Sequence, residues 1–546
     1  MASRIRLPCP WTRPSTGPIP STAAIPQPTL YRAGAAGRAS ARRRHPFPER
    51  RPAGCLGDPG QRHPRPAVHP VYTFDNRQEA AQLWYHDHTA GLTRLNVYMG
   101  LAGNYFIRDA NEEALSLPKP PYEVALLIQD RSFLADGELF YAHQDPAAPG
   151  LPNPTHLPEN FGDVVLVNGV AWPLLEVEPR KYRFRVLNGS DSRVYDMSLS
   201  NRMPFIQIGS DLGLLNAPVE LQVLSLAPGE RADIILDFAR MEGQTIVIGN
   251  SAAAPYPDGD PVDAATAGQV MAFRVNQPLS RVPDRPLPSN LRPLSGPVPA
   301  ITRAIRTRKI LLFEGTDARG RLQTMAGIVD SSRPALNGTL VFTDPITENP
   351  QLGDTEVWEF YNSSADAHPI HMHLVDFRIL GRQKFKGTIT PKTNSDGSEG
   401  GVLDEASINL LGKARPPSRE EAGKKDTAKM FPGEVTRVAA RFTRPGEYVY
   451  HCHILSHEDH QMMRPYFVGQ LPRALRRRSS RAPEGSMRTP SFLRRHHADS
   501  LDLRAGGRVL GGLLPRGGAA PGGRHPAAPP RPRRAHPRWR RARAGR

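Results

Sequence analysis

The amino-acid sequence predicts an all-β protein, a β-sandwich or barrel, over residues 71–470. Short segments rich in aromatic and β-branched residues, alternating in the β fashion, recur through this part of the chain. Turn residues separate them, and two proline-rich links, 145–162 and 278–299, divide them into three blocks. A chain of 546 residues has material for three or four domains, and a hydrophobic content of 39% is sufficient for their cores.

The expected strands can be followed along the chain. Order begins abruptly at residue 71, and a turn at Asp136-Gly137 joins two strands. In the third block a polar insert at 390–429 interrupts the strand pattern, and we expect it to be a surface loop. The segments with strand patterns are 71–109, 119–145, 163–252 and 307–469.

Positive charge is concentrated at the two ends of the chain. The formal net charge of +18 divides into +10 for residues 1–70, +17 for residues 471–546 and −9 for the part between them. Both ends are rich in Arg, Pro, Gly and Ala without a regular apolar period, so we expect them to be disordered. Because the body is mildly acidic, no nucleic-acid partner is expected.

The cysteines and the hydrophobic pattern say little about the compartment. Cys9, Cys55 and Cys452 form no plausible disulfide framework. No run of 18 apolar residues occurs, so no membrane span is expected, and the N-terminus lacks the apolar core of a secretory signal.

The segment with the most chemical information is residues 451–463, HCHILSHEDHQMM. If residues 448–454 form a strand, Cys452 points to one face while His451 and His453 point to the other. Thiolate, imidazole and a weak axial thioether are the ligands of blue copper, and Cys452, His457 and Met462 would supply three of the four.

Three His-x-His triplets occur, whereas composition alone would give roughly 0.6. They indicate metal binding, because one of them encloses the cysteine. His368 differs in strand parity from His371 and His373, so it could join Cys452 while the other two face the second centre. The triplets are His86/His88, His371/His373 and His451/His453, and we expect His86 and His88, which flank Asp87, to share a strand face. The histidines without such spacing, His143, His156 and His460 among them, are predicted to be surface residues.

Four segments resemble the multicopper oxidases, and within them the bacterial spore-coat laccase and bilirubin oxidase subgroup. They are WYHDHTAGLTRLNVYMGLAG, VNGVAWPLLEVEPRKYRFRVLNGS, HPIHMHLVDFRIL and PGEYVYHCHILSHEDHQMMRPY. The resemblance implies three cupredoxin-like domains of Greek-key β-barrel type, the first truncated. It also implies a type 1 copper in the third domain and a trinuclear cluster of type 2 and type 3 copper between the first and third.

Carried over by residue, the resemblance implies that His368, Cys452 and His457 bind type 1 copper with Met462 as the axial residue. His371 would bind type 2 copper. Type 3 copper would be bound by His86, His88, His373, His451 and His453. Glu458 matches an acidic residue that would relay protons to oxygen; from the sequence alone, a surface or capping carboxylate is an equal interpretation.

The implied function is that of a laccase-like oxidase. Single electrons from phenols, aromatic amines or bilirubin-like pigments would enter at type 1 copper, and dioxygen would be reduced to water at the cluster. The partners would be a small aromatic reductant and dioxygen. The resemblance leaves the compartment open between the spore coat and the cytoplasm, and it does not give the oligomeric state.

The chain departs from the family pattern at its start. An N-terminal His-x-His-Gly motif, with one type 2 and one type 3 ligand, is missing, and His45, His63 and His69 form no such pair. One interpretation is a divergent protein with a damaged cluster. The favoured one is a reading-frame error, in which the correct frame is joined near Val71 and lost near Gly469.

A chain with an incomplete cluster could also be a copper-binding, electron-transfer or structural coat protein. The expected division is a basic segment, a partial first cupredoxin domain, a second domain with its links, a third domain with type 1 copper, and a basic tail. Their limits are 1–70, 71–145, 146–299, 300–470 and 471–546.

Overall fold

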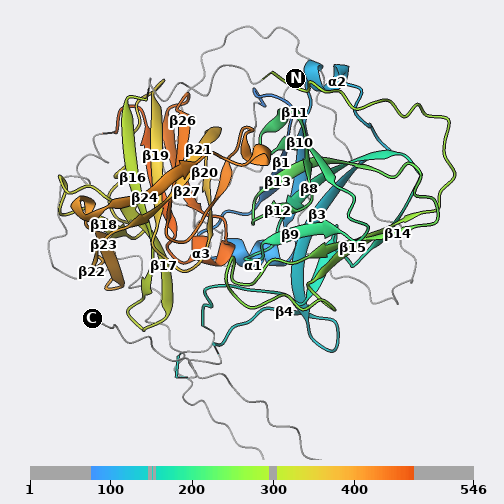
Figure 1. Ribbon diagram of the computed structural model, residues 1–546. Helices are drawn as coiled ribbons and strands as arrows, with labels where there is room; N and C mark the ends of the chain where they lie inside the picture. Colours follow the sequence, from blue (N-terminus) through green and yellow to red (C-terminus); the bar gives the residue numbers. More distant parts are fainter. Residues whose placement is uncertain (1–75, 146–149, 152–154, 294–303, 473–546) are drawn as a thin grey trace, which may run out of the picture. The chain divides into compact units, whose positions relative to one another are not determined.

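The computed structural model describes residues 76–145, 150–151, 155–293 and 304–472, and strands dominate these parts of the chain (Figure 1). The predicted all-β class is therefore confirmed. The expectation of disorder at residues 1–70 and 471–546 concerns segments outside the described residues, apart from Leu471 and Pro472. No described helix is long and apolar enough to cross a membrane.

The first lobe is small. It contains an antiparallel pair of strands in which His86 is opposite Ala102. His88 follows the last residue of the first strand, so the expectation that both histidines share a strand face is wrong. The elements are β1 (Ala81–His86), α1 (Thr93–Tyr98), β2 (Ala102–Ile107) and α2 (Ala110–Ala114).

The second lobe packs two sheets around an aromatic core that includes Phe184, Phe238 and Phe273. The eight-stranded sheet has the order β11-β10-β13-β8-β3-β5-β6, with β4 beside β3, and the five-stranded sheet has the order β12-β9-β14-β15-β7. The strands of the first sheet are β3 (Glu123–Phe133), β4 (Leu139–Phe140), β5 (Val164–Val167), β6 (Val170–Ala171), β8 (Lys181–Asn188), β10 (Phe205–Ser210), β11 (Gly213–Leu221) and β13 (Arg231–Asp237). Those of the second are β7 (Leu174–Val177), β9 (Tyr195–Leu199), β12 (Leu224–Leu226), β14 (Thr245–Asn250) and β15 (Gln269–Val275).

The third lobe has a nine-stranded and a four-stranded sheet, and its apolar core includes Cys452 and Met462. The four-stranded sheet has the order β25-β20-β27-β28. Its strands are β20 (His368–Met372), β25 (Thr427–Met430), β27 (Gly446–Cys452) and β28 (Met463–Val468), with α3 (Leu455–Asp459) before β28. The nine strands are β16 (Arg306–Thr316), β17 (Leu322–Ile328), β18 (Gly338–Leu340), β19 (Thr355–Asn362), β21 (Phe377–Lys386), β22 (Ile389–Thr393), β23 (Glu399–Leu403), β24 (Asn409–Arg415) and β26 (Glu434–Arg441).

One sequence expectation is wrong in this topology, and we propose a change to another. The segment 390–429 is not a loop, because it includes most of β22, all of β23 and β24, and the start of β25; polar residues suit strands whose outer faces meet water. The expected limit between the first and second domains, at residue 145, would place β3 in the first domain. β3 pairs with β5 and β8 of the second lobe, so it belongs to that sheet. On this pairing we propose that the first lobe ends between α2 and β3.

Candidate copper centres

Strand pairing explains how one segment serves two sites. In the antiparallel pair of β20 and β27, Ile370 is opposite Cys452 and His371 is opposite His451. His368 has the parity of Ile370, so it shares a sheet face with Cys452, while His371 and His451 share the other face. The strand ends at Cys452, two residues earlier than the sequence analysis assumed.

The first site joins His368, Cys452 and His457. The Cys452 Sγ lies 3.7 Å from His368 Nδ1 and 3.6 Å from His457 Nδ1. All three side chains are buried, and their candidate ligand atoms lie within 4.8 Å of one another. Three donors in a trigonal plane at about 2.1 Å from a shared ion would be about 3.6 Å apart, so this group fits a Cys/His₂ copper site.

Met462 lies beside this group in the fold. It is fully buried, its carbonyl accepts from the backbone N–H of Cys452 at 3.0 Å, and its own N–H donates to the carbonyl of His457 at 3.0 Å. These bonds fasten the end of α3 to the end of β27. The expected axial residue is thereby held next to both the cysteine and the second histidine.

The outer edges of the two imidazoles meet polar groups. The Nε2 of His368 lies 2.7 Å from Ser364 Oγ and 3.6 Å from Glu314 Oε1. The Nε2 of His457 lies 4.0 Å from Glu159 Oε1. With Nε2 turned outward, Nδ1 of each ring is left facing the cysteine.

The second site is a cluster of imidazoles from the first and third lobes. His451 Nε2 lies 3.3 Å from His88 Nε2 and 3.2 Å from His373 Nε2. These three candidate ligand atoms also fall within 4.8 Å of one another, so they fit a single ion. The rings of His86 and His371 are centred 5.4 Å and 5.7 Å from that of His453.

Carbonyl oxygens orient three of the cluster rings. The Nδ1 atoms of His86, His371 and His451 lie 2.7, 2.8 and 2.9 Å from the carbonyl oxygens of Asp87, Asp426 and Cys452. Because a carbonyl only accepts, each Nδ1 carries the proton and each Nε2 keeps a lone pair. This arrangement of a metal-binding histidine, with its other nitrogen hydrogen-bonded, is the usual one.

Burial keeps these groups in their neutral forms. It lowers the pKa of His368 to about 3 and, together with repulsion from His88, that of His86 to about 4. Burial likewise raises the pKa of the Cys452 thiol well above its usual range. Neutral imidazoles are ready to bind copper, whereas the thiol must release a proton on binding.

Glu458 lies behind the cluster. Its carboxylate oxygens are 3.4 Å from His88 Nδ1 and 3.2 Å from His451 Nδ1, and its side chain is 1% exposed. Burial raises the pKa of Glu458 well above its usual range. It is therefore a buried carboxyl group that contacts the outer nitrogens of two cluster histidines, and the interpretation as a surface residue is wrong.

Some features of the site could not be read from sequence. His156 and His460, expected at the surface, are partly buried and stack with ring centres 3.7 Å apart. Trp84 stacks on His453 at 5.1 Å and lies 4.3 Å from the ring of His86. Trp84 and His86 alternate on one strand, so their contact could have been predicted. The His156–His460 and Trp84–His453 contacts carry no such signal, because their partners are distant in sequence.

Comparison with known proteins agrees with this geometry. Two family models, each described as multicopper oxidase, match residues 316–471 and residues 57–112, the second match beginning inside the segment 1–70. The laccase of Bacillus stratosphericus is 43% identical over 406 residues, which are 73% of this chain and 74% of that protein. The chain belongs to the multicopper oxidase family.

Other members show the same relationship. The laccase of Bacillus subtilis (strain 168) is 44% identical over 400 residues, 72% of each chain. The crystal structure of McoA multicopper oxidase from Aquifex aeolicus matches with a TM-score of 0.55 and 28% identity, over 73% of this chain and 78% of that one. The protein is thus a copper-dependent oxidase of cupredoxin-like fold, and the family implies copper of types 1, 2 and 3.

Proposed function

We propose that this multicopper oxidase takes single electrons from phenols, aromatic amines or bilirubin-like pigments and reduces dioxygen to water. One observation carries the proposal: Cys452 contributes its sulfur to one group while its neighbour His451 contributes Nε2 to the other. Consecutive residues of one strand thus connect the two sites by covalent bonds. Bound copper would supply electron acceptance at the first site and oxygen reduction at the second.

We assign the residues as the family resemblance implies. His368, Cys452 and His457 would hold type 1 copper, with Met462 in the axial position. Type 2 copper would be held by His371. The type 3 residues would be His86, His88, His373, His451 and His453. The grouping of imidazole nitrogens and the outward hydrogen bonds described above support these assignments.

Glu458 is assigned to proton transfer in the reaction of oxygen. Burial raises the pKa of Glu458 well above its usual range, which favours the protonated carboxyl group, and its oxygens contact His88 and His451 at the edge of the cluster. A buried carboxylic acid in this position can deliver a proton and recover it. Separately, we propose that access to the first copper site, rather than the shape of a binding pocket, limits which reductants the protein oxidises.

The test is copper content combined with oxygen uptake by the full chain. We expect a thiolate charge-transfer band at about 600 nm, additional non-blue copper, and oxygen consumption with a phenol. A blue protein that consumes no oxygen would refute the oxidase assignment for this chain and favour electron transfer. A protein without the blue band would refute the first site.

A further inference from the structure

A turn of the second lobe, residues 227–231, reaches the copper cluster although this lobe has none of the proposed ligands. Gly229 has φ +82°, and a Cβ added there would lie 2.4 Å from Cδ2 of His453. A side chain at this position would therefore displace the imidazole ring. The backbone N–H of Gly229 donates to the carbonyl of Asn188 at 2.9 Å, which holds the turn against the second lobe.

Arg231, at the end of this turn, connects all three lobes. It is 2% exposed, and its Nε donates to the carbonyl of Gln82 on β1 at 3.1 Å. Its Nη1 donates to the Gly229 carbonyl at 2.9 Å and to Asp426 Oδ1 at 2.7 Å. Its Nη2 donates to the Asp211 carbonyl at 3.0 Å and to Asp426 Oδ2 at 2.6 Å. Every N–H of the guanidinium therefore has an acceptor.

Asp426 carries the contact onward to His371. Its carbonyl oxygen lies 2.8 Å and its carboxylate 3.6 Å from His371 Nδ1. The Thr427 hydroxyl, 3.2 Å from the same nitrogen, donates to the Asp426 carboxylate at 3.0 Å. The position of the Asp426 residue thus sets where the His371 ring points.

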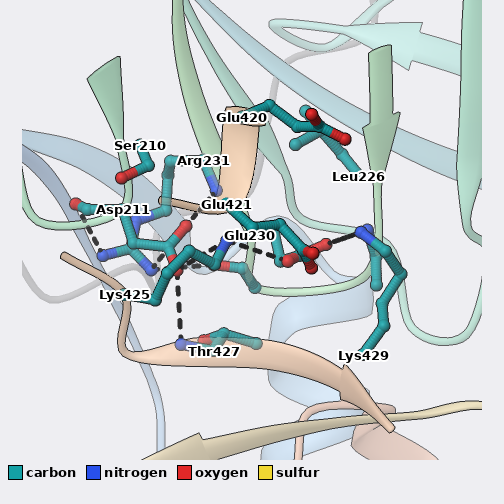
Figure 2. A network of polar contacts seen from close by, with 12 residues as sticks. Ser210, Asp211, Leu226, Glu230, Arg231, Glu420, Glu421, Lys425, Thr427 and Lys429 are labelled. Atoms are coloured by element: carbon teal, nitrogen blue, oxygen red, sulfur yellow. Dashed lines mark hydrogen bonds and ion pairs between the residues drawn. The ribbon is translucent and has the colours of Figure 1, made fainter. Parts of the chain in front are cut away.

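The surrounding charged side chains stabilise the buried ion pair of Arg231 and Asp426. Figure 2 shows Lys425 between Asp211 and Glu230, and Lys429 beside Glu230. The Lys425 ammonium lies 3.1 Å from Asp211 and 2.9 Å from Glu230, and that of Lys429 lies 2.6 Å from Glu230. Together with Arg231 and Asp426 these side chains balance in charge. A buried ion pair is tolerated only where the charges are compensated and the hydrogen bonds are made, and both conditions are met here.

We propose that Arg231 is a positioning residue for the oxygen-reducing cluster. Through Asp426 it fixes the imidazole of His371, and through the carbonyl of Gln82 it fixes β1, the strand that ends in His86. The guanidinium fork is required because its donors hold the Asp426 carboxylate at two points while reaching three backbone carbonyl groups. This inference rests on the proposed function of the cluster histidines.

The test is Arg231→Lys in the full chain. Lysine keeps the charge but cannot hold Asp426 at two points. Copper is titrated into the metal-free protein while the band at about 600 nm and the paramagnetic signal of non-blue copper are followed. We expect the affinity for non-blue copper to fall roughly 10–100-fold and its hyperfine splitting to change, with the blue band intact.

A matched control is Arg308→Lys. Arg308 makes the same kind of two-point pair with Glu356, at 2.6 and 2.8 Å, between β16 and β19 of the third lobe. No described contact links it to a histidine of either site. This variant should bind both kinds of copper as the parent does, and selective loss of non-blue copper from it would overturn the inference.

The outcomes distinguish the role of Arg231 from the presence of the copper cluster itself. Non-blue copper bound equally by the parent and Arg231→Lys, with an unchanged signal, would overturn the role of Arg231 alone. Absence of non-blue copper from the parent would overturn the cluster itself. If Arg231→Lys fails to fold, Asp426→Asn replaces it. Asparagine has nearly the same side-chain size and leaves the backbone carbonyl in place, but it lacks the negative charge that Arg231 holds. Unaltered non-blue copper in Asp426→Asn would likewise overturn the inference.

Discussion

Replacing Cys452 by serine tests the first site most directly. The sulfur is the atom 3.6–3.7 Å from both imidazole nitrogens, and a hydroxyl does not ionise to replace it. In the metal-free protein, a buried hydroxyl without a partner costs about 1–3 kcal/mol. When the free copper concentration is about 1,000 times the dissociation constant of this site, bound copper adds about 4 kcal/mol to the free energy of unfolding of the parent. The variant should lose this stabilisation.

The assay combines spectroscopy, copper analysis and thermal unfolding with and without copper. We expect Cys452→Ser to lose the blue band and substrate oxidation completely. Non-blue copper should stay, because His88, His373 and His451 form their own group. Cys9→Ser together with Cys55→Ser is the matched control and should remain blue. A blue Cys452→Ser variant would refute the assignment.

Three further predictions concern other groups. Met462→Leu should keep its copper but raise the reduction potential in a redox titration, since a weak axial donor is removed; loss of blue copper would contradict this. Glu458→Gln should slow oxygen uptake roughly 10–100-fold with the blue band unchanged, and normal uptake would exclude its role. Burial opposes ionisation of Glu123, but Arg185, Arg183 and Arg108 outweigh it and lower its pKa from 4.5 to about 2. The stabilisation is therefore present above pH 4.5 and lost toward pH 2. The difference in unfolding free energy between the metal-free parent and Glu123→Gln should shrink by about 2 kcal/mol from pH 5 to pH 3, and a constant difference would refute it.

Local rules of the backbone were sufficient to predict the sheet faces of three candidate copper residues in the third lobe. Strand alternation assigned Cys452 and His368 to one side and His451 to the other, as the structure has them. Such parity depends only on residues that are neighbours on one strand. It failed at His88 because the strand ends at His86, and the end of a strand depends on its partner strand rather than on the alternation of residues.

The polar insert shows a different limit. Residues 390–429 lack the apolar alternation of a buried strand, so composition favoured a loop. In the fold they add strands to the nine-stranded sheet and lead into Asp426, beside the cluster. β22 and β23 pair with each other, whereas β24 and β25 pair with β21 and β20, which lie before the insert, so these contacts and not apolar alternation decide the conformation.

The sequence by itself determined the fold class, the family and a set of candidate copper residues, because strand periodicity, motif spacing and the resemblance of four segments all depend on neighbouring residues. Only the tertiary structure decided that His88 from the first lobe lies 3.3 Å from His451, and that Arg231 of the second lobe holds Asp426 of the third. These contacts join residues 363 and 195 positions apart. Their geometry follows from how the lobes pack, and no local pattern encodes that packing.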